Sequence, residues 1–495
     1  MRAIPDLPAR DWHDAAGLDF AGVTADSRRV KDGYLFAALP GSRADGRLFI
    51  ADAVARGAAA VLAPEGTAWP DTVPARPLIL DPEPRRRLAQ IAAALAGAQP
   101  DLVVAVTGTN GKTSTVEFLR QIWAASGQQA ASLGTLGLHA PGFPPGPGLT
   151  TPDPETLADT LARLARAGVQ HAAMEASSHG LDQFRLDGVH LAAGAFTNLT
   201  RDHLDYHGTL DAYRAAKLRL FRDLLAPGAP AVASGTLDAA TLAALREIAA
   251  ARRLGLQVVG EGGDSIRLLR TVPLPDGQVI EIETSGARHE ITLALPGRFQ
   301  TDNVLVAAAL AQATGTRDVL AVLPRLTGVR GRMELAARLA NGAAVYVDYA
   351  HTPDALERLL SALRPHTHAR LHVVFGAGGD RDRGKRPLMG EAAARLADVA
   401  VVTDDNPRSE DPATIRAEVL AGCRAAGNGR GRDGGERRAA IASALSDLGP
   451  DDVLVVAGKG HEQGQTIAGM TLPFDDAETV RHLLGTASPR GQEEA

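Results

Sequence analysis

The sequence predicts an α/β protein built from three domains. At 495 residues the chain is too long for one ordinary hydrophobic core, and about two to four domains are expected. Short apolar runs that end in glycine or polar residues alternate with helical patterns, which is the order of a parallel sheet covered by helices. We place the three domains at residues 1–98, 99–330 and 331–495.

The first domain, residues 1–98, is predicted to be a small α/β unit. Its segments 33–39 (GYLFAAL) and 58–63 (AAAVLA) are apolar and predict buried strands. The segment 49–58 between them predicts a helix, and a second helix is expected near residues 85–97.

The central domain opens with the apolar run 101–108, which predicts a strand. A helical pattern follows it, and two further strands are predicted at 170–176 and 191–198. The proline-rich segment 142–154 can form neither a helix nor an inner strand. We expect it to be a stiff loop, and such loops often carry ligand contacts.

The strongest local signal is the segment 107–114 (TGTNGKTS), between the first strand and the helix. Backbone N–H groups of a glycine-rich turn, together with a helix N-terminus, can bind phosphate oxygens. Lys112 would bridge the β- and γ-phosphates of a nucleotide, and the Thr113 hydroxyl would bind Mg²⁺. The strict P-loop pattern is not met, because Val106 stands where its first glycine is expected. The sequence therefore predicts a central P-loop-type nucleotide-binding parallel sheet with ATP contacts from Gly108, Thr109, Asn110, Gly111, Lys112, Thr113 and Ser114.

The third domain repeats one arrangement, in which an apolar strand runs directly into glycine or charged residues. The segments are 343–351, 370–380, 398–408 and 451–462. Because ligands of open parallel sheets bind at the carboxyl ends of strands, we expect a Rossmann-like domain with a ligand site there. The glycine-rich segment 427–435 is expected to be a flexible surface loop without chemistry.

Composition excludes several classes of protein. The formal net charge is −6 and no long basic run occurs, which argues against nucleic-acid binding. Cys423 is the only cysteine, so no disulfide can form within the chain. The first 30 residues lack an apolar core segment, and no stretch of about 18 uncharged apolar residues occurs. We therefore expect neither a signal peptide nor a membrane span, and a cytoplasmic location.

An ordered set of motifs covers nearly the whole chain. Besides the P-loop variant they are DSR (26–28), TTPD (150–153), MEASSHGL (174–181), FTNLTRDHLDYHG (196–208), AAK (215–217), GRME (331–334), DYAHTPDAL (348–356), GGDRDRGKRPLMG (378–390), DNPR (405–408) and GKGHE (458–462). Each motif alone is weak, but the set in this order resembles the Mur ligase family, within the superfamily that also contains folylpolyglutamate synthetases. The resemblance is strongest to the branch that adds the third residue of the peptidoglycan peptide.

That resemblance implies an ATP-dependent acid–amino-acid ligase of cell-wall synthesis. Its substrates would be UDP-N-acetylmuramoyl-L-alanyl-D-glutamate and meso-2,6-diaminopimelate, with ATP and Mg²⁺ as cofactors and a monomer as the working form. ATP would phosphorylate the D-glutamate γ-carboxylate, and an amine of the amino acid would then attack the acyl phosphate.

Glu175 ends an apolar strand, where a carboxylate can hold magnesium beside a nucleotide. The roles of His203 and Lys217 come from the resemblance. It implies that His203 binds a second magnesium ion and that Lys217 is carbamylated by CO₂, which requires a partly desolvated lysine with a depressed pKa. The expected catalytic residues are thus Lys112, Lys217 and His203, and the expected metal ligands are Thr113, Glu175, His203 and carbamylated Lys217.

The resemblance also assigns residues to the three ligands. Contacts to the UDP-sugar dipeptide are expected from Ser27, Ser42, Arg43, Ala44, Thr150, Thr151, Ser177, Gln183 and Arg185. Further ATP contacts are expected from Asn303, Arg332, Asp348 and His351. Contacts to diaminopimelate are expected from Arg381, Asp405, Asn406, Pro407, Arg408, Gly458 and Glu462. Two residues depart from the family pattern: Leu149 stands where some family members have asparagine, and Gln300 replaces the usual asparagine.

The choice of amino acid is expected to depend on Arg408. meso-Diaminopimelate carries a distal carboxylate that lysine lacks, and an arginine can bind a carboxylate through two parallel hydrogen bonds. Three alternatives stay open: a relative that adds lysine, a folylpolyglutamate synthetase-like ligase, and a P-loop binding or regulatory protein without ligase chemistry.

Overall fold

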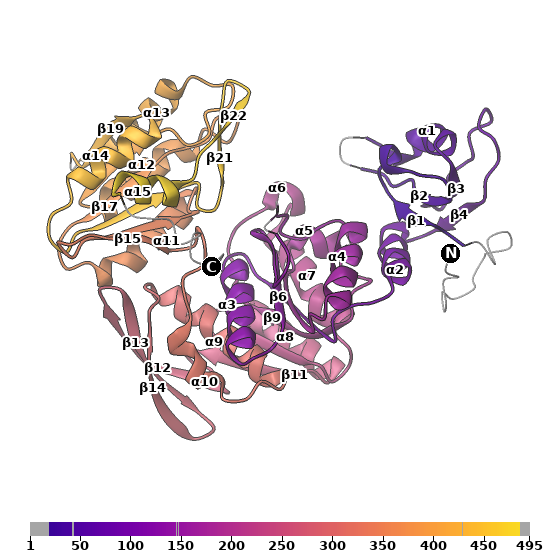
Figure 1. Ribbon diagram of the computed structural model, residues 1–495, viewed down its shortest axis with the longest axis horizontal. Helices are drawn as coiled ribbons and strands as arrows, with labels where there is room; N and C mark the ends of the chain where they lie inside the picture. Colours follow the sequence, from indigo (N-terminus) through magenta and orange to yellow (C-terminus); the bar gives the residue numbers. More distant parts are fainter. Residues whose placement is uncertain (1–18, 42–43, 145, 147, 428, 486–495) are drawn as a thin grey trace. The chain divides into compact units, whose positions relative to one another are not determined.

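The computed structural model describes residues 19–41, 44–144, 146, 148–427 and 429–485 (Figure 1). The chain divides into two compact units, one of Met1–Ser265 with Leu305–Val319 and one of Ile266–Val304 with Leu320–Ala495. Both units are built from strands and helices in alternation, so the predicted α/β class is confirmed.

The first unit begins with a parallel sheet of order β1-β2-β3-β4, indigo in Figure 1. Its elements are β1 Gly22–Thr24, β2 Tyr34–Ala37, α1 Ile50–Ala55, β3 Ala58–Pro64, β4 Leu78–Asp81 and α2 Pro84–Ala96. The two predicted strands and two predicted helices are thereby confirmed. The first helix is shorter than expected, because a 3₁₀ turn at Gly46–Phe49 precedes it and Gly57, with a φ of +98°, follows it.

Helices cover both faces of this small sheet. Leu35 on β2 packs with Leu88 on α2, whereas its neighbour Phe36 packs with Ile50 on α1. Successive side chains of a strand point to opposite faces, so a sheet covered on both sides needs continuous apolar strands. This explains why the strands were visible as unbroken apolar runs.

A larger sheet of order β7-β6-β8-β5-β9-β10-β11 follows in the first unit. Only β6 and β7 pair antiparallel among these described strands; the other neighbours are parallel. The strands are β5 Leu102–Thr107, β6 Ala130–Gly134, β7 Gly137–His139, β8 His171–Glu175, β9 Leu191–Phe196, β10 Pro230–Ser234 and β11 Gly255–Gly260. The helices are α3 Lys112–Ala125, α4 Pro154–Arg166, α5 Ser178–Asp182, α6 Leu204–His207, α7 Leu210–Arg219 and α8 Ala239–Arg252. Strands β5, β8 and β9 confirm the three strands predicted for this domain.

Strand β5 lies between β8 and β9, and this order positions the P-loop. Val106 pairs with Glu175 at the end of β8, and Thr107 pairs with Phe196 at the end of β9. Because the three strands are parallel, their carboxyl ends meet at one edge of the sheet. The glycine-rich turn after β5 therefore lies beside Glu175 and beside the residues that follow β9.

The second unit begins with antiparallel strands of order β14-β13-β12. They are β12 Ile266–Leu274, β13 Gly277–Thr284 and β14 Ala287–Leu293, and the helices α9 Arg298–Ala313 and α10 Val319–Val322 come next in sequence. Ser285 and Gly286 connect β13 to β14 with φ angles of +51° and +76°. Two left-handed residues are what a two-residue hairpin loop requires.

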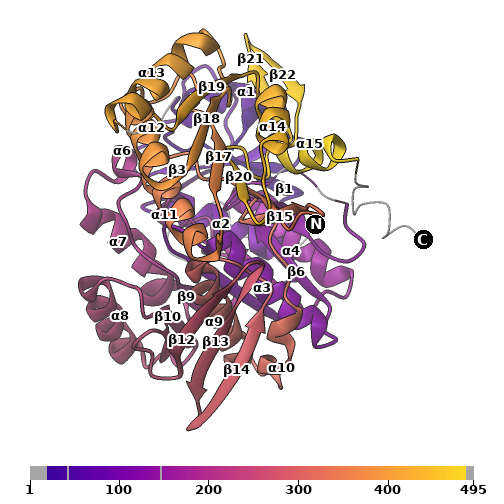
Figure 2. The same ribbon diagram turned by 90° about the vertical axis from the view of Figure 1, so that its left-hand side faces the viewer.

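The rest of the second unit forms a sheet of order β15-β16-β20-β17-β18-β19 (Figure 2). Its elements are β15 Glu334–Arg338, β16 Ala344–Asp348, α11 Pro353–Leu363, β17 Leu371–Phe375, α12 Lys385–Leu396, β18 Val399–Thr403, α13 Pro412–Ala425, β19 Gly431–Gly435, α14 Arg437–Ser446, β20 Val453–Ala457 and α15 Asp476–Leu483, with the hairpin β21 Gly464–Ile467 and β22 Met470–Pro473. The four predicted strands are β16, β17, β18 and β20, which are neighbours and parallel. Their carboxyl ends consequently share one edge, as expected.

The expectation of a flexible loop at 427–435 is wrong for its second half. Residues Gly431–Gly435 form β19, which pairs with β18 at the edge of the sheet. A Cβ on Gly434 would collide with side chains of Val401 and Ala440, so glycine here allows α14 to pack closely on the strand. The abundance of glycine indicated a loop, but Gly434 instead allows a helix to pack closely against a strand.

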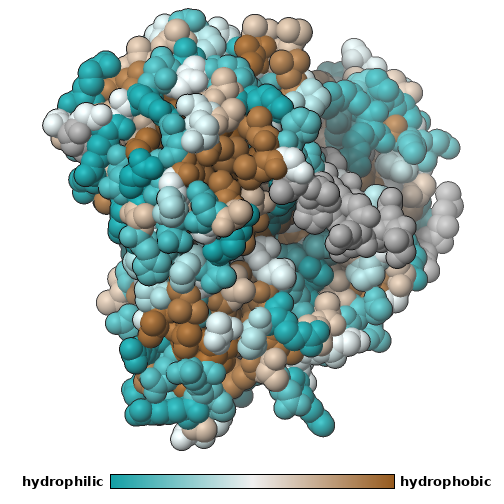
Figure 3. All heavy atoms as spheres, turned by 60° about the vertical axis from the view of Figure 1, so that its left-hand side comes forward, coloured by the Kyte–Doolittle hydropathy of each residue, from teal (hydrophilic) through white to brown (hydrophobic). Residues whose placement is uncertain are grey.

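Within the described ranges, no helix combines the length and the apolar character that crossing a bilayer requires. Figure 3 shows one face of the molecule, on which hydrophilic residues surround separate apolar patches.

Candidate active site

The predicted phosphate-binding loop joins β5 to α3. Gly108 and Gly111 have φ angles of +146° and +82°, a conformation that favours glycine. A Cβ on Gly108 would collide with the hydroxyl of Thr197, which donates a hydrogen bond to the Asn110 carbonyl at 2.6 Å. The loop is thus held against the end of β9. The first N–H groups of α3 have no carbonyl partner within their own helix, which is the arrangement that binds phosphate.

Two lysines converge on the loop. Nζ of Lys112 donates to the carbonyl oxygens of Gly108 and Thr109, both at 2.9 Å. Nζ of Lys217, on α7, donates to the same Gly108 oxygen at 2.7 Å and lies 4.4 Å from the centre of the Tyr213 ring. Lys217 is only 1% exposed. Burial, and then repulsion from Lys112, hold the pKa of Lys217 well below its usual range.

Glu175 ends β8 as a buried carboxylate next to the loop. Its Oε1 accepts hydrogen bonds from the Thr113 hydroxyl at 3.0 Å and from the Thr135 N–H at 2.7 Å. A Cβ on Gly134 would collide with this carboxylate, so the glycine makes room for it. The Thr135 hydroxyl also lies 3.0 Å from that of Thr150, which brings this predicted contact to the same place.

The residues around Glu175 fit a magnesium ion. Carboxylate and hydroxyl oxygens are the ligands that Mg²⁺ prefers, and Glu175 and Thr113 place both within hydrogen-bonding distance of each other. Among the described residues, no group of three or more His, Cys, Asp or Glu side chains is arranged to hold a metal. A magnesium site here would therefore draw on the Thr113 hydroxyl beside the Glu175 carboxylate.

His203 lies in a cluster of rings near the loop. It has a φ of +52°, immediately before α6, and its side chain is about half exposed. Its ring centre lies 4.9 Å from that of His179 and 6.1 Å from that of Tyr213. The Tyr213 hydroxyl donates to the Thr109 hydroxyl at 3.2 Å, and burial raises the pKa of Tyr213 to about 12. Tyr213 thus connects His203 with the P-loop.

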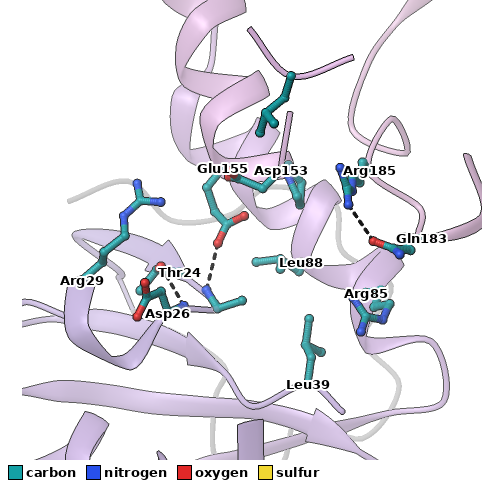
Figure 4. A pocket seen from close by; sticks show the side chains of 13 residues that line it. Thr24, Asp26, Arg29, Leu39, Arg85, Leu88, Asp153, Glu155, Gln183 and Arg185 are labelled. Atoms are coloured by element: carbon teal, nitrogen blue, oxygen red, sulfur yellow. Dashed lines mark hydrogen bonds between the residues drawn. The ribbon is translucent and has the colours of Figure 1, made fainter. Parts of the chain in front are cut away.

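A cavity of about 410 Å³ lies in the first unit (Figure 4). Gln183 and Arg185, both predicted contacts of the nucleotide sugar, line it, and Nη2 of Arg185 donates to Oε1 of Gln183 at 2.8 Å. Arg29 and Arg85 line it as well, and the sequence had not singled them out. Guanidinium groups can bind phosphate oxygens through charge-assisted hydrogen bonds, and the acidic residues Asp26, Asp153 and Glu155 line the same cavity.

The same cavity contains a carboxyl group with a raised pKa. Glu155, on α4, accepts a hydrogen bond from the Ala25 N–H at 2.8 Å. Burial, and to a lesser extent the nearby Asp153 carboxylate, raise the pKa of Glu155 to about 7. Glu155 therefore ties the loop after β1 to α4, as Figure 4 shows.

Three predicted dipeptide contacts form hydrogen bonds with the protein's own loops. The Thr151 hydroxyl donates to the Glu175 carbonyl at 2.9 Å and accepts from the Ser177 N–H at 2.9 Å. The Ser177 hydroxyl accepts from the Gly180 N–H at 3.0 Å and caps α5. Nη1 of Arg185 donates to the Thr151 carbonyl at 2.6 Å. These residues are brought together, and their bonds fix the loop before α4.

The remaining predicted UDP-sugar contacts belong to the loops of the first sheet. Ser27 is buried at the start of a 3₁₀ turn whose N-cap is Asp26. Ala44 is exposed. Ser42 and Arg43 lie outside the described residues.

The second unit gathers the other predicted ATP contacts near the end of β16. Asp348 accepts hydrogen bonds from the N–H groups of Met333 at 2.7 Å and Ala350 at 2.9 Å. Burial raises the pKa of Asp348. The guanidinium of Arg332 lies 4.6 Å from the centre of the Tyr349 ring.

Asn303 and His351 complete this group. Nδ1 of His351 lies 2.8 Å from the Tyr349 carbonyl oxygen. Nδ2 of Asn303 donates to Oε1 of Gln300 at 3.3 Å, and Nε2 of Gln300 donates to the Arg332 carbonyl at 3.3 Å. The glutamine that departs from the family pattern therefore links Asn303 to the backbone of Arg332.

Arg408 is anchored by its backbone. It has a φ of +54° and follows β18. Its N–H donates to the Thr466 carbonyl at 2.9 Å, and its carbonyl accepts from the Ala468 N–H at 2.7 Å, so it pairs with the β21–β22 hairpin. Nη1 of Arg408 donates to the Gly379 carbonyl at 2.6 Å.

Other predicted amino-acid contacts lie beside it. The Gly379 N–H donates to the Asn406 carbonyl at 2.9 Å, and a Cβ on Gly379 would collide with the Pro407 carbonyl, so the loops after β17 and β18 touch. Nδ2 of Asn406 donates to Oε2 of Glu462 at 3.0 Å. Arg381 is exposed in the loop after β17.

Asp405 marks a place for a hydrogen-bond donor. It is 6% exposed, and within the described part of the chain its Oδ1 has no hydrogen-bond partner. A buried carboxylate oxygen without a donor is unfavourable unless a ligand or water supplies one. Gly458, with a φ of +122°, allows close approach, since a Cβ there would lie 3.2 Å from Oδ2 of Asp405.

Two buried cations of this region had not been singled out. Lys459 and Arg437 have fully buried side chains, and Arg437 forms an ion pair with Asp476 at 2.7 Å. The GKGHE motif contains Lys459, but only the packing of the chain after β20 shows that it is buried. Arg437 lies in no motif, so no signal in the sequence pointed to it.

Fold and site together define an α/β protein with a P-loop. Three family models match consecutive parts of the chain: "Mur ligase family, catalytic domain" at 19–96, "Mur ligase middle domain" at 106–311 and "Mur ligase, glutamate ligase domain" at 331–460. The chain therefore belongs to the Mur ligase family, and the resemblance stated from its motifs is confirmed.

Curated relatives match almost end to end. The chain is 55% identical over 476 residues to the UDP-N-acetylmuramoyl-L-alanyl-D-glutamate--2,6-diaminopimelate ligase of Caulobacter vibrioides, covering 94% of this chain and 96% of that protein. It is 52% identical over 486 residues to the ligase of the same name from Rhizobium meliloti, covering 97% and 98%.

Solved structures agree. A structure of UDP-N-acetylmuramoyl-L-alanyl-D-glutamate--2,6-diaminopimelate ligase superposes with a TM-score of 0.70 at 34% identity, covering 94% of this chain and 95% of that one. The MurF ligase of Thermotoga maritima in complex with ADP has a TM-score of 0.60 at 19% identity, covering 93% and 96%, and shows likeness of fold alone.

Proposed function

We propose that this chain is an ATP-dependent ligase that joins meso-2,6-diaminopimelate to the D-glutamate γ-carboxylate of UDP-N-acetylmuramoyl-L-alanyl-D-glutamate. The relatives from Caulobacter vibrioides and Rhizobium meliloti are named for this ligation and align over nearly their whole length. The proposal depends chiefly on one observation: three groups contact or adjoin the loop at Gly108. They are Lys112, Lys217 and the hydrogen-bonded pair Thr113–Glu175.

A carboxylate is a poor electrophile at neutral pH, so it must first be phosphorylated by ATP. The phosphate-binding loop would hold that nucleotide. A γ-carboxylate oxygen bonds to the γ-phosphorus of ATP, the bond to the β–γ bridging oxygen breaks, and ADP leaves. The amine nitrogen then bonds to the acyl carbon, phosphate leaves with the electron pair of the C–O bond, and the nitrogen loses a proton. Lys112 would neutralise charge on the phosphoryl group being transferred.

The oxygens of Thr113 and Glu175 would hold magnesium. When bound, the ion would neutralise negative charge on the nucleotide phosphates. His203 as the ligand of a second ion stays a prediction, supported by its connection to the loop through Tyr213.

We infer that Lys217 carries a carbamate. The neutral amine nitrogen bonds to the carbon of CO₂ and one proton is released, so a cation becomes an anion. Burial and the neighbouring Lys112 favour the neutral amine, because both lower the pKa of Lys217. A carbamate would offer oxygen ligands to a hard cation that an ammonium group would repel.

Arg408 supports diaminopimelate as the amino acid rather than lysine. Its guanidinium can bind the distal carboxylate of diaminopimelate. Oδ1 of Asp405 is buried and accepts no hydrogen bond within the described residues, which supports a ligand that also presents a donor such as an ammonium group.

The test is ADP release by the full chain with ATP, Mg²⁺ and the UDP-muramoyl dipeptide, comparing meso-diaminopimelate with L-lysine. We expect turnover with diaminopimelate and little with lysine, and Arg408→Ala should narrow that preference. Preference for lysine would overturn the choice of amino acid. Turnover with a folate and glutamate in place of both substrates would favour a folylpolyglutamate synthetase-like ligase.

Lys112→Ala tests the mechanism. Loss of ADP formation is expected, and unchanged ADP formation would overturn the assignment of the loop. A wild-type chain that binds ATP without amino-acid-dependent turnover would instead favour a P-loop binding protein. The predicted domain boundaries, the cytoplasmic location and the monomeric state remain predictions.

A further inference from the structure

A fully buried lysine lies within the predicted amino-acid pocket. Lys459 follows β20, and its side chain has no exposed surface. Its Nζ donates to Oδ1 of Asn406 at 3.0 Å and to Oε2 of Glu462 at 3.1 Å, and lies 3.8 Å from Oδ1 of Asp405. A buried ammonium group needs such acceptors, because it has lost its water. Asn406, Glu462 and Asp405 are all residues that we assign to diaminopimelate.

The contacts around Lys459 close a ring. Nδ2 of Asn406 donates to the same Oε2 of Glu462 at 3.0 Å. Oδ1 of Asn406 accepts from both Lys459 and the Thr466 N–H, which fixes the orientation of the amide. Within the described residues, the two hydrogen bonds accepted by the Glu462 carboxylate thus fall on Oε2. Its Oε1 is left to accept from a ligand.

A buried ion pair accompanies this closed set of hydrogen bonds around Lys459. Arg437 and Asp476 are both fully buried and form two hydrogen bonds at 2.7 Å. That pair balances its own charge, whereas Nζ of Lys459 lies 3.1 Å from Oε2 of Glu462 and 3.8 Å from Oδ1 of Asp405. Without it, the buried Asp405 carboxylate and the partly exposed Glu462 carboxylate would both lose a neighbouring cation, and an uncompensated buried charge is unfavourable.

We propose that Lys459 is a positioning residue for the amino-acid substrate. It holds Asn406 and Glu462 in the geometry that receives the ligand, and it does not bind the ligand itself, since its contacts are already taken by protein oxygens. This inference rests on the proposed function and names a residue that sets recognition of the amino acid.

The test is a comparison of Michaelis constants for the three substrates in the full chain. Lys459→Met keeps a long unbranched side chain and removes the charge. We expect the KM for diaminopimelate to rise about 10- to 100-fold, the range expected when a hydrogen-bonded charge is removed. The KM values for ATP and for the UDP-muramoyl dipeptide should stay within about twofold of wild type, since the side-chain contacts of Lys459 described above go to residues assigned to the amino acid.

Asp452→Asn is the matched control. Asp452 is a buried charge at the opposite end of β20, where it binds Arg370 and His372. It should lower the thermal unfolding midpoint without changing any KM. A double-mutant cycle adds a second readout: in an Asn406→Ala background, Lys459→Met should have a smaller effect on the KM for diaminopimelate than in wild type.

Each outcome decides the proposal. An unchanged KM for diaminopimelate in Lys459→Met, an equal rise of all three constants, or the same rise in Asp452→Asn would overturn it. If Lys459→Met does not fold, Lys459→Arg keeps the charge but moves its donors, and should raise the KM for diaminopimelate alone, by a smaller factor. A wild-type chain that releases no ADP with diaminopimelate would instead overturn the proposed function and this inference with it.

Discussion

Nζ of Lys217 lies 2.7 Å from the carbonyl oxygen of Gly108, although 109 positions separate the two residues. Nζ of Lys112 lies 2.9 Å from the same oxygen. Two ammonium groups on one oxygen in a buried site repel each other, which adds to the effect of burial on the pKa of Lys217. Beside the P-loop, burial and the neighbouring Lys112 therefore favour the deprotonated form of Lys217.

Lys217→Arg places a permanent cation at this position and cannot form the proposed carbamate. We expect its rate of ADP release to fall by about 10²- to 10³-fold, comparable to the loss of one group that stabilises the transition state. Labelling with ¹³C-bicarbonate should give a carbamate NMR signal in wild type and none in the variant. Wild-type activity in Lys217→Arg would contradict the carbamate.

Glu175→Gln should weaken magnesium binding. The amide loses the negative charge, so the Mg²⁺ concentration for half-maximal ADP release should rise by about tenfold. Glu117→Gln is a matched control in the same unit, since Glu117 is buried and bonded to Ser132 and Arg120. It should lower stability and leave the Mg²⁺ dependence as in wild type; equal Mg²⁺ curves for both variants would refute the role of Glu175.

Glu155 should make the first unit less stable as pH rises. Its pKa is about 7 in the folded chain against 4.5 for an ordinary glutamate. Between these values the unfolded chain releases a proton that the folded chain keeps, so unfolding becomes easier as pH increases. Glu155→Gln should be more stable than wild type by about 2 kcal/mol at pH 8 and similar at pH 4.5. Thermal unfolding at the two pH values measures this, and equal differences at both would count against it.

His366 should make the second unit less stable in acid. Its Nε2 accepts from the Gly297 N–H at 2.9 Å and its Nδ1 lies 2.8 Å from the Leu274 carbonyl oxygen, so the ring must be neutral. Burial lowers the pKa of His366 below the ordinary 6.5. Its contribution is thus complete above about pH 6.5 and is lost as pH falls toward the folded pKa.

His366→Gln tests this expectation. It should be less stable than wild type by about 1–2 kcal/mol at pH 7.5, with a smaller difference at pH 5. His368→Gln, at an exposed position two residues away, should leave the stability of wild type unchanged at both pH values. A difference for His366→Gln that does not depend on pH would contradict a neutral, hydrogen-bonded imidazole.

Most of the sheet architecture could be predicted because strands covered on both faces must be apolar throughout. β16, β17, β18 and β20 each stood out for this reason, and so did the polar residues at their carboxyl ends. β19 could not be predicted from its sequence, GRDGG, because Gly434 is required by the close approach of Val401 and of Ala440 on α14. Local composition does not contain that contact.

The site was predictable where its residues are neighbours in sequence, as in the P-loop. Long-range packing set the rest. Arg85 reaches the cavity from the first turn of α2, and the buried Lys459 donates a hydrogen bond to Asn406, 53 positions earlier in the chain. Conversely, the Thr151 hydroxyl, expected at a ligand, is bonded to the Glu175 carbonyl.

The pairing of Arg408 with the β21–β22 hairpin bears on how amino-acid preference can change among such ligases. The backbone N–H and carbonyl of Arg408 are hydrogen-bonded to Thr466 and Ala468. These two bonds stabilise the left-handed conformation of Arg408. Introducing only this arginine into a lysine-adding relative would thus add the charge without fixing the orientation of the guanidinium group. Changing the amino-acid preference would also require the β21–β22 hairpin to be transferred.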